Sequence, residues 1–215
     1  MTIDARIERM LLAGPAGPLE ALLEWLPQTE PRMTALVCHP HPLFGGTMHT
    51  KVVFRAAKAA ISLGLPTLRF NFRGVGRSKG VFDSGAGERD DVRAALDFLS
   101  ARFPHLPTVL MGFSFGCWVG LAVGATDPRV SALVGLGVPV RSSDMSYLAG
   151  VTKPKLIVQG TEDVYGPRRR VEEFYSRLPA PKSISWIEGA DHFFSGKLGE
   201  AHAAVRLFLG SLAHP

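Results

Sequence analysis

The feature that most constrains the fold is a repeated alternation of short apolar runs with segments whose apolar residues recur at helical spacing. Thr34–Cys38 is a continuous apolar run, typical of a strand buried on both faces. Further strands are expected over 66–71, 107–112, 130–138, 154–160 and 182–188, and helices over 47–63, 88–102, 115–125, 167–178 and 197–212. Strands that alternate with helices predict a mostly parallel sheet with helices on both faces.

The first 32 residues differ from this alternation. Two apolar-rich runs, 5–12 and 19–26, are separated by the turn residues Gly14-Pro15-Ala16-Gly17-Pro18, which predicts an N-terminal β-hairpin belonging to the same sheet. No internal repeat or linker divides the chain, so residues 1–215 are expected to form a single α/β domain. A length of 215 residues argues against a complete TIM barrel, which needs about 250.

Composition and charge narrow the class of protein. A chain that is 46% hydrophobic and 20% charged is neither disordered nor fibrous. The net charge of +5 comes from scattered basic residues, so no nucleic-acid partner is expected. The densest run, Arg168–Arg170, is followed by Glu172 and Glu173, which favours a solvated helix face over an anion contact.

No export or membrane signal is visible in the sequence. The N-terminus carries alternating charges instead of an apolar segment. The uncharged run from Val109 to Ala125 is shorter than the roughly 20 apolar residues of a bilayer span. Cys38 and Cys117 are too few for a disulfide framework and suit buried positions in a reducing compartment. A cytoplasmic protein without membrane attachment is therefore expected.

The motif that points most directly to chemistry is Gly112-Phe113-Ser114-Phe115-Gly116. It lies between a predicted strand and a predicted helix, the context in which G-x-S-x-G forms a nucleophile elbow. Small residues at both glycine positions allow strand and helix to approach closely. Ser114 is therefore the candidate nucleophile.

A serine hydroxyl needs a base and an orienting acid. Asp163 and His192 each follow a predicted strand, and ligand sites of such sheets lie beyond the carboxyl ends of the strands. The order Ser114, Asp163, His192 matches the Ser…Asp…His order of one hydrolase class. Other candidates for these two roles are predicted in less suitable places: Glu162 and Asp191 for the acid, and His105 and His202 for the base.

Acyl transfer also requires donors for an oxyanion. The backbone N–H of Phe115, which follows the nucleophile, is the first candidate. The second should come from the loop after Cys38, where Pro40 and Pro42 lack an N–H. His41 and Leu43 are the nearest alternatives, with a narrow preference for His41.

Two further stretches carry a resemblance to a known family. They are His39-Pro40-His41-Pro42-Leu43-Phe44-Gly45-Gly46-Thr47-Met48 and Arg73-Gly74-Val75-Gly76-Arg77-Ser78-Lys79-Gly80. The chain resembles the α/β-hydrolase superfamily along essentially its whole length, and the first stretch is similar to small bacterial hydrolases related to dienelactone hydrolase. The resemblance implies an α/β-hydrolase fold with about eight strands, a Ser-His-Asp triad and acyl hydrolysis. Dienelactone hydrolases proper use a cysteine where this chain has Ser114, so their substrate is not transferred.

Two weaker motifs are set aside. Gly74-x-Gly76 is not followed by a predicted helix, as a dinucleotide loop requires. His39 and His41, with His49 as a possible third ligand, fit a rigid proline loop better than a metal site. Neither a cofactor nor a metal is therefore expected.

The connection 140–153 is too short for a cap domain, so an open or shallow site is expected. An apolar wall is predicted from Phe44, Phe113, Phe115, Met145, Tyr147 and Phe193. The sequence predicts a serine hydrolase of small or medium acyl esters, acting on a small-molecule substrate. A thioesterase or peptidase with the same residues, or a non-catalytic binding module on the same fold, remain alternatives, and the oligomeric state is left open.

Overall fold

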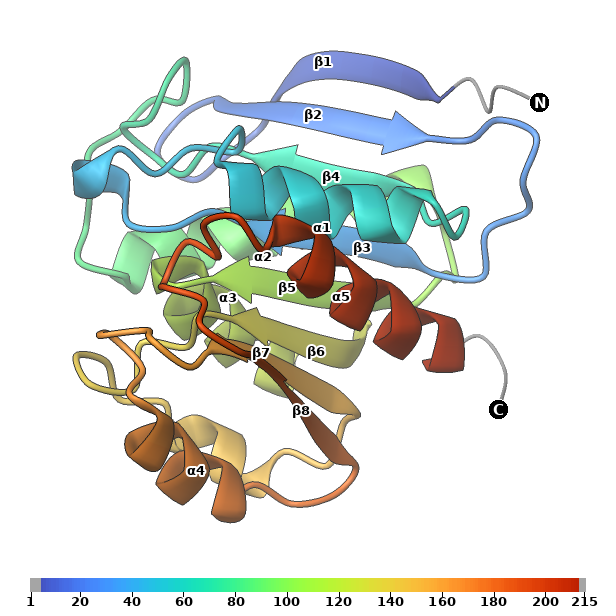
Figure 1. Ribbon diagram of the computed structural model, residues 1–215. Helices are drawn as coiled ribbons and strands as arrows, with labels where there is room; N and C mark the ends of the chain where they lie inside the picture. The colour runs from blue at the N-terminus through green and yellow to red at the C-terminus, as the bar shows by residue number, and fades with distance from the viewer. Residues whose placement is uncertain (1–4, 213–215) are drawn as a thin grey trace.

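The computed structural model describes residues 5–212, so residues 1–4 of the predicted hairpin and residues 213–215 of the predicted domain lie outside the described residues. Within this range eight strands form one sheet in the order β1-β2-β4-β3-β5-β6-β7-β8 (Figure 1). The strands are β1 (Arg6–Leu12), β2 (Leu19–Trp25), β3 (Thr34–Cys38), β4 (Thr67–Phe70), β5 (Thr108–Phe113), β6 (Val130–Leu136), β7 (Lys155–Gly160) and β8 (Lys182–Ile187).

Of the eight strands in the described part of the chain, β2 alone runs opposite to the others. β1 and β2 form an antiparallel hairpin, and β2 then pairs antiparallel with β4. All pairs from β4 to β8 are parallel. The predicted hairpin therefore belongs to the same sheet, and the carboxyl ends of six parallel strands meet at one edge.

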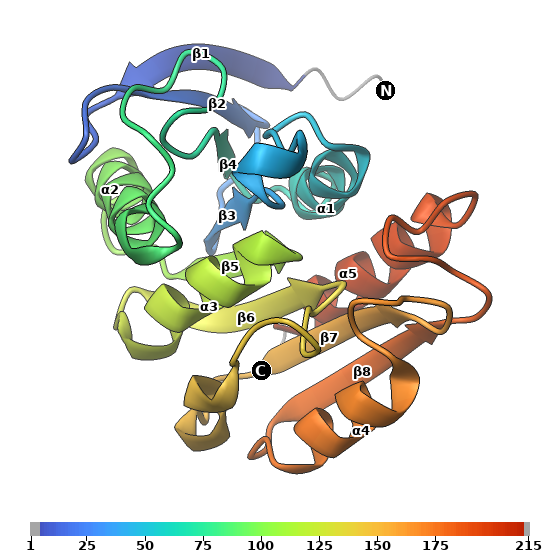
Figure 2. The same cartoon turned by 90° about the vertical axis from the view of Figure 1, so that its left-hand side faces the viewer.

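Helices cover both faces of the sheet (Figure 2). They are α1 (Lys51–Ile61), α2 (Ala86–Arg102), α3 (Phe115–Thr126), α4 (Arg168–Ser176) and α5 (Leu198–Leu212). Side chains of β3 alternate between the two cores: Leu36 and Cys38 pack with α2 and α3, whereas Ala35 and Val37 pack with α1 and α5. These layers confirm the predicted α/β-hydrolase architecture.

The starts of two helices differ from the prediction by two residues or more. α1 begins at Lys51 with Thr50 as its N-cap, and Thr47 instead uses its hydroxyl to accept the N–H of His49. α2 begins at Ala86, two residues before the predicted start, because the Glu88 carboxylate accepts the N–H groups of Asp83 and Gly85 and closes the first turn. The predicted loop after β4 is correspondingly shorter.

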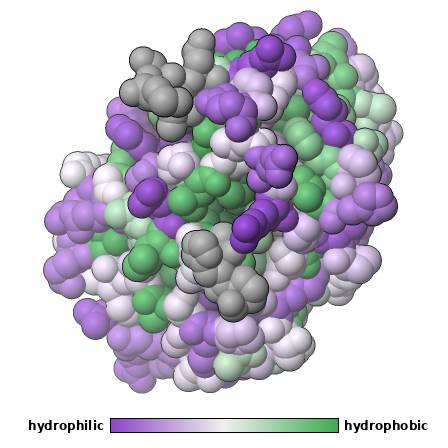
Figure 3. Space-filling model, turned by 90° about the vertical axis from the view of Figure 1, so that its right-hand side faces the viewer, coloured by the Kyte–Doolittle hydropathy of each residue, from purple (hydrophilic) through white to green (hydrophobic). Residues whose placement is uncertain are grey.

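The connection between β6 and β7 contains a short 3₁₀ helix, η2 (Ser146–Gly150), and no inserted domain. None of the helices over residues 5–212 has the length and apolar character needed to cross a membrane. The opposite edge of the sheet, where the parallel strands begin, exposes hydrophilic side chains interspersed with apolar ones (Figure 3).

Candidate active site

Ser114 lies in the turn between β5 and α3, where the backbone is strained. Its φ of 54° and ψ of −116° are unfavourable for a residue with a side chain. The Ser114 N–H donates to the carbonyl of Leu136 on β6 (3.0 Å), which holds the turn. A Cβ at Gly112 would overlap the Gly116 carbonyl, and a Cβ at Gly116 would overlap the Cys38 carbonyl. The two glycines therefore allow the close approach that the sequence motif predicted.

The structure brings Ser114, His192 and Asp163 into one chain of hydrogen bonds. His192 Nδ1 lies 2.7 Å from Asp163 Oδ2, and His192 Nε2 lies 2.9 Å from Ser114 Oγ. A carboxylate oxygen only accepts, so Nδ1 carries the ring proton and Nε2 accepts the hydroxyl proton of Ser114. The arrangement suits transfer of that proton to His192.

Asp163 is held by a residue that the sequence analysis missed. The fully buried Gln159, on β7, donates from Nε2 to Asp163 Oδ2 (2.7 Å) and accepts the Val138 N–H at Oε1 (2.8 Å). The other carboxylate oxygen accepts the N–H groups of Tyr165 and Gly166. The acid therefore has a fixed orientation. A lone glutamine at a strand end carries no sequence signal that would have revealed this role.

The candidate oxyanion donors are not equivalent. The Leu43 N–H donates to Nδ1 of His41 (3.2 Å), so it is already engaged. Over residues 5–212, neither the N–H of His41 nor that of Phe115 donates a hydrogen bond within the chain. His41 and Phe115 both line the cavity around Ser114. The geometry thus favours His41 over Leu43 as the partner of Phe115.

His39 has a structural role. It is completely buried, donates from Nδ1 to the Pro40 carbonyl (2.7 Å) and accepts the Phe72 N–H at Nε2 (2.9 Å). Burial lowers the pKa of His39 to about 4, so the ring is neutral at pH 7. Both ring nitrogens are used, which leaves none for a metal. This histidine instead ties the loop after β3 to the loop after β4.

A buried ion pair holds the loop after β4. Asp91 of α2 is fully buried and accepts hydrogen bonds from the backbone N–H, Nε and Nη2 of Arg73. Asn71 adds a link by accepting the Met48 N–H (2.8 Å). The loops after β3 and after β4 are therefore fixed by buried polar side chains that lie far apart in the sequence.

A cavity of about 730 Å³ opens above Ser114 and His192. The predicted wall residues Phe44, Phe115 and Phe193 line it, joined by three aromatic residues that the sequence analysis had not assigned to it. These are Phe82, Trp118 and Tyr165.

The remaining wall predictions were wrong. Phe113 is fully buried against the His192 ring, with ring centres 5.0 Å apart. Met145 lines a different cavity, and the Tyr147 hydroxyl donates to the carbonyl of Trp118 (2.9 Å).

The alternative acid and base candidates lie outside the hydrogen-bond chain. Asp191 accepts the N–H groups of Phe193 and Ser195, and it thereby shapes the turn that carries His192. Glu162 is exposed. His105 is exposed in a loop, and the His202 ring contacts the Arg55 carbonyl on α1.

Comparisons with known proteins agree with this fold. A crystal structure from Xanthomonas campestris, described as an α/β serine hydrolase without lid, is 34% identical with a TM-score of 0.88, covering 96% of this chain and 95% of that one. An α/β serine hydrolase homologue from Coxiella burnetii is 40% identical with a TM-score of 0.88, covering 94% and 97%. An uncharacterized protein of Rickettsia prowazekii is 37% identical over 206 residues, 91% of this chain and 86% of the relative.

The model of the alpha/beta hydrolase domain family matches residues 35–204, which run from β3 into α5 and include Ser114, Asp163 and His192. With this match and these relatives, the chain belongs to the alpha/beta hydrolase domain family.

Proposed function

We propose that the protein is a serine hydrolase that cleaves small or medium acyl esters with Ser114, His192 and Asp163. The observation that carries the proposal is the continuous hydrogen-bond chain from Asp163 through His192 to Ser114 at the base of an open cavity. His41 and Phe115, whose N–H groups have no acceptor within residues 5–212, line the same cavity.

The proposed reaction has two halves. Ser114 Oγ attacks the ester carbonyl carbon while its proton passes to His192 Nε2, and the two N–H groups stabilise the negative carbonyl oxygen. His192 then gives that proton to the leaving alcohol, which departs as the acyl-enzyme forms. Water attacks the acyl-enzyme with His192 again as base, and the acid and free Ser114 are regenerated.

The residues that line the cavity beside Ser114 support the proposed class of substrate. The aromatic residues Phe44, Phe82 and Phe115 offer an apolar surface beside Ser114, and Phe44 is 85% exposed at the entrance. With only η2 between β6 and β7, no cap encloses a long lipid chain. The Xanthomonas relative without lid supports this reading, and the loop His39–Met48 supports a closer relation to dienelactone hydrolases.

The test combines labelling with turnover. A fluorophosphonate probe should label the purified protein, Ser114→Ala should abolish labelling, and Ser211→Ala, which changes an exposed serine on α5, should not. The protein should also hydrolyse 4-nitrophenyl acetate. A folded protein that neither labels nor turns over would contradict the proposal and favour a non-catalytic binding module.

A matched panel separates the ester assignment from its alternatives. Thioesterases and peptidases share the same mechanism, so the panel should hold one acyl group constant and vary the leaving group as oxygen ester, thioester or anilide. We expect the highest kcat/KM for the oxygen ester.

A further inference from the structure

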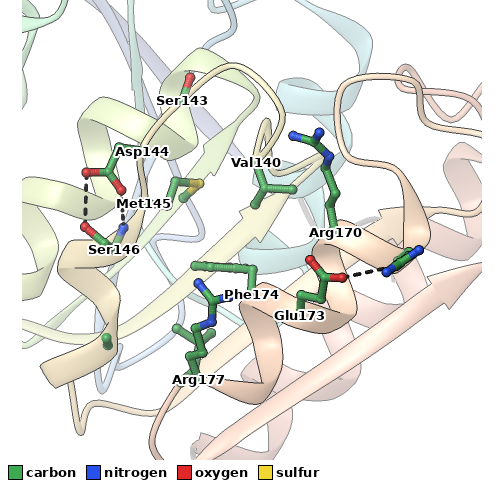
Figure 4. A pocket seen from close by; sticks show the side chains of 12 residues that line it. Val140, Ser143, Asp144, Met145, Ser146, Arg170, Glu173, Phe174 and Arg177 are labelled. Atoms are coloured by element: carbon green, nitrogen blue, oxygen red, sulfur yellow. Dashed lines mark hydrogen bonds and ion pairs between the residues drawn. The ribbon is translucent and has the colours of Figure 1, made fainter.

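A second cavity of about 590 Å³ lies between α4 and the connection from β6 to β7 (Figure 4). Its apolar lining comes from both elements: Val140 and Met145 on one side, Phe174 and Leu178 on the other. Met145 and Leu178 are buried, whereas Phe174 is half-buried. The cavity therefore has an apolar surface that could hold a short hydrocarbon segment.

The three consecutive arginines of α4 have different surroundings. Arg168 pairs with Glu172 (3.0 Å) and stacks over Trp186, away from the cavity. Arg169 pairs with Glu173 (3.1 Å) at the cavity rim. Arg170 lines the cavity and, within residues 5–212, has no side-chain partner.

Arg177, the C-cap residue immediately after α4, supplies a second guanidinium group. It also lines the cavity, and its side chain has no partner in the part of the chain that the structure describes. Figure 4 shows Arg170 extending toward Val140 and Arg177 lying alongside Phe174. Two cations with free donors thus flank an apolar surface.

Two carboxylates in the lining, those of Glu173 and Asp144, offset only part of this positive charge. Glu173 is paired with Arg169. Asp144 accepts the N–H and the hydroxyl of Ser146 (2.9 and 3.0 Å), bonds that lower its pKa and keep it charged. The lining therefore holds three arginines and two carboxylates, a net charge of +1, and within residues 5–212 the two guanidinium groups without a carboxylate partner are those of Arg170 and Arg177.

The second cavity adjoins the candidate active site. Ser143 and Asp144 line both cavities, so this short segment forms a shared wall. An extended molecule with its ester at Ser114 can pass over that wall into the second cavity.

We infer that the second cavity is a subsite for the anionic end of the substrate. This inference rests on the proposed esterase function and sharpens its substrate class. The substrate would be an ester joined through a short apolar segment to a carboxylate or phosphate. The apolar segment would contact Met145 and Phe174, and Arg170 and Arg177 would bind the anion through charge-assisted hydrogen bonds.

The experiment compares matched anionic and neutral esters. One series consists of mono-4-nitrophenyl esters of dicarboxylic acids with five to nine carbons, each paired with its methyl-capped neutral counterpart. A second series consists of acetates of ω-hydroxy acids and of ω-hydroxyalkyl phosphates of similar length, paired with acetates of simple alcohols. The two series place the anion on the acyl side or the alcohol side, and the second also separates carboxylate from phosphate.

We expect one chain length at which kcat/KM of the anionic ester exceeds that of its neutral partner. Arg170→Gln and Arg177→Gln should each lower this anionic-to-neutral ratio about threefold, and the double variant about tenfold, as expected for exposed charge pairs. Arg168→Gln is the matched control on the same helix and should leave the ratio unchanged. Raising the salt concentration should shrink the preference, because it screens exposed charges.

Binding without turnover separates this inference from the proposed function. Ser114→Ala protein should bind the best anionic acid of the series by titration calorimetry, and the Arg170→Gln, Arg177→Gln form of it should not. Retained binding with no turnover of any ester would overturn the esterase proposal and leave the anion site standing. Equal kcat/KM for anionic and neutral esters in both series, with Ser114 active, would overturn the subsite.

Discussion

The carboxyl-terminal edge of the sheet is built differently on its two sides. On the β5–β8 side, Ser114, Asp163 and His192 lie in the short connections after β5, β7 and β8, and the close backbone packing at Gly112 and Gly116 fixes the turn of the nucleophile. On the β3–β4 side, two longer loops are held by buried polar contacts: His39 joins the loop after β3 to Phe72 in the loop after β4, and Asp91 of α2 holds Arg73.

The comparison indicates that, at one edge of the sheet, residues on the β5–β8 side take part in the reaction, whereas the loops on the β3–β4 side shape the cavity. Changes on the β5–β8 side should first alter the rate of the chemical step. Changes in the buried contacts of the β3–β4 side should first lower stability, because unpaired buried polar groups are costly. Four substitutions test this separation.

The largest effect is expected for Asp163→Asn. Its Oδ2 accepts from His192 and Gln159, and an amide would place a donor where acceptors are needed and disturb the imidazole tautomer. We expect kcat for 4-nitrophenyl acetate to fall about 10⁴-fold. Glu162→Gln, at the exposed neighbouring acid, should stay within about threefold. A loss under tenfold for Asp163→Asn would contradict the assigned role.

Asp91→Asn tests the β3–β4 side of the sheet edge. It removes the buried charge that pairs with Arg73, and breaking such a pair costs about 3–5 kcal/mol. Denaturant titration should show this fall in the free energy of unfolding. Asp90→Asn is the control, since its exposed pair with Arg93 should contribute under about 1 kcal/mol. Equal losses in the two variants would refute the importance of burial.

His39 should make stability depend on pH. Burial lowers its pKa from 6.5 to about 4, so its neutral form favours the folded state fully above pH 6.5, and this contribution disappears as the pH falls through 4. His39→Gln lacks this titration. The stability lost by the variant should therefore be about 2–3 kcal/mol larger at pH 7.5 than at pH 4.5.

The control for this prediction is His105→Asn, which changes an exposed histidine. Its effect on the free energy of unfolding should be the same at both pH values. A pH-independent effect of His39→Gln would show that the histidine does not hold the two loops in its neutral form.

The smallest effect is expected for Gln159→Leu. The variant keeps the hydrogen bond from His192 to Asp163 but removes the donor that orients the acid. We expect kcat to fall about tenfold, the loss of one charge-assisted hydrogen bond, with KM within twofold. A rise in KM at constant kcat would instead assign Gln159 to the shape of the cavity.

The sequence predicted the β5–β8 side better than the β3–β4 side for a physical reason. Strand-to-helix turns leave local patterns, and G-x-S-x-G before α3 and the acid and base after β7 and β8 are visible within a few residues. The contacts of His39 and Arg73 join residues that lie 33 and 18 positions from their partners. No local pattern encodes such pairs.

The residues that line the cavities also could not be predicted from local sequence patterns. Phe113 and Phe115 differ by two positions, yet Phe113 is buried under His192 and Phe115 lines the active-site cavity. The helix expected over 47–63 begins only at Lys51, because the loop from His39 extends further before it turns. Which residue of an aromatic-rich segment meets solvent depends on how the neighbouring elements pack.

The short connection between β6 and β7 has a consequence for the time course of turnover. Since no domain must swing aside, substrate entry and product departure need no slow rearrangement. Progress curves should begin without a lag and should not accelerate when the substrate passes from dissolved monomers to droplets. The interval between turnovers would then be set by bond making and breaking at Ser114, not by the opening of a gate.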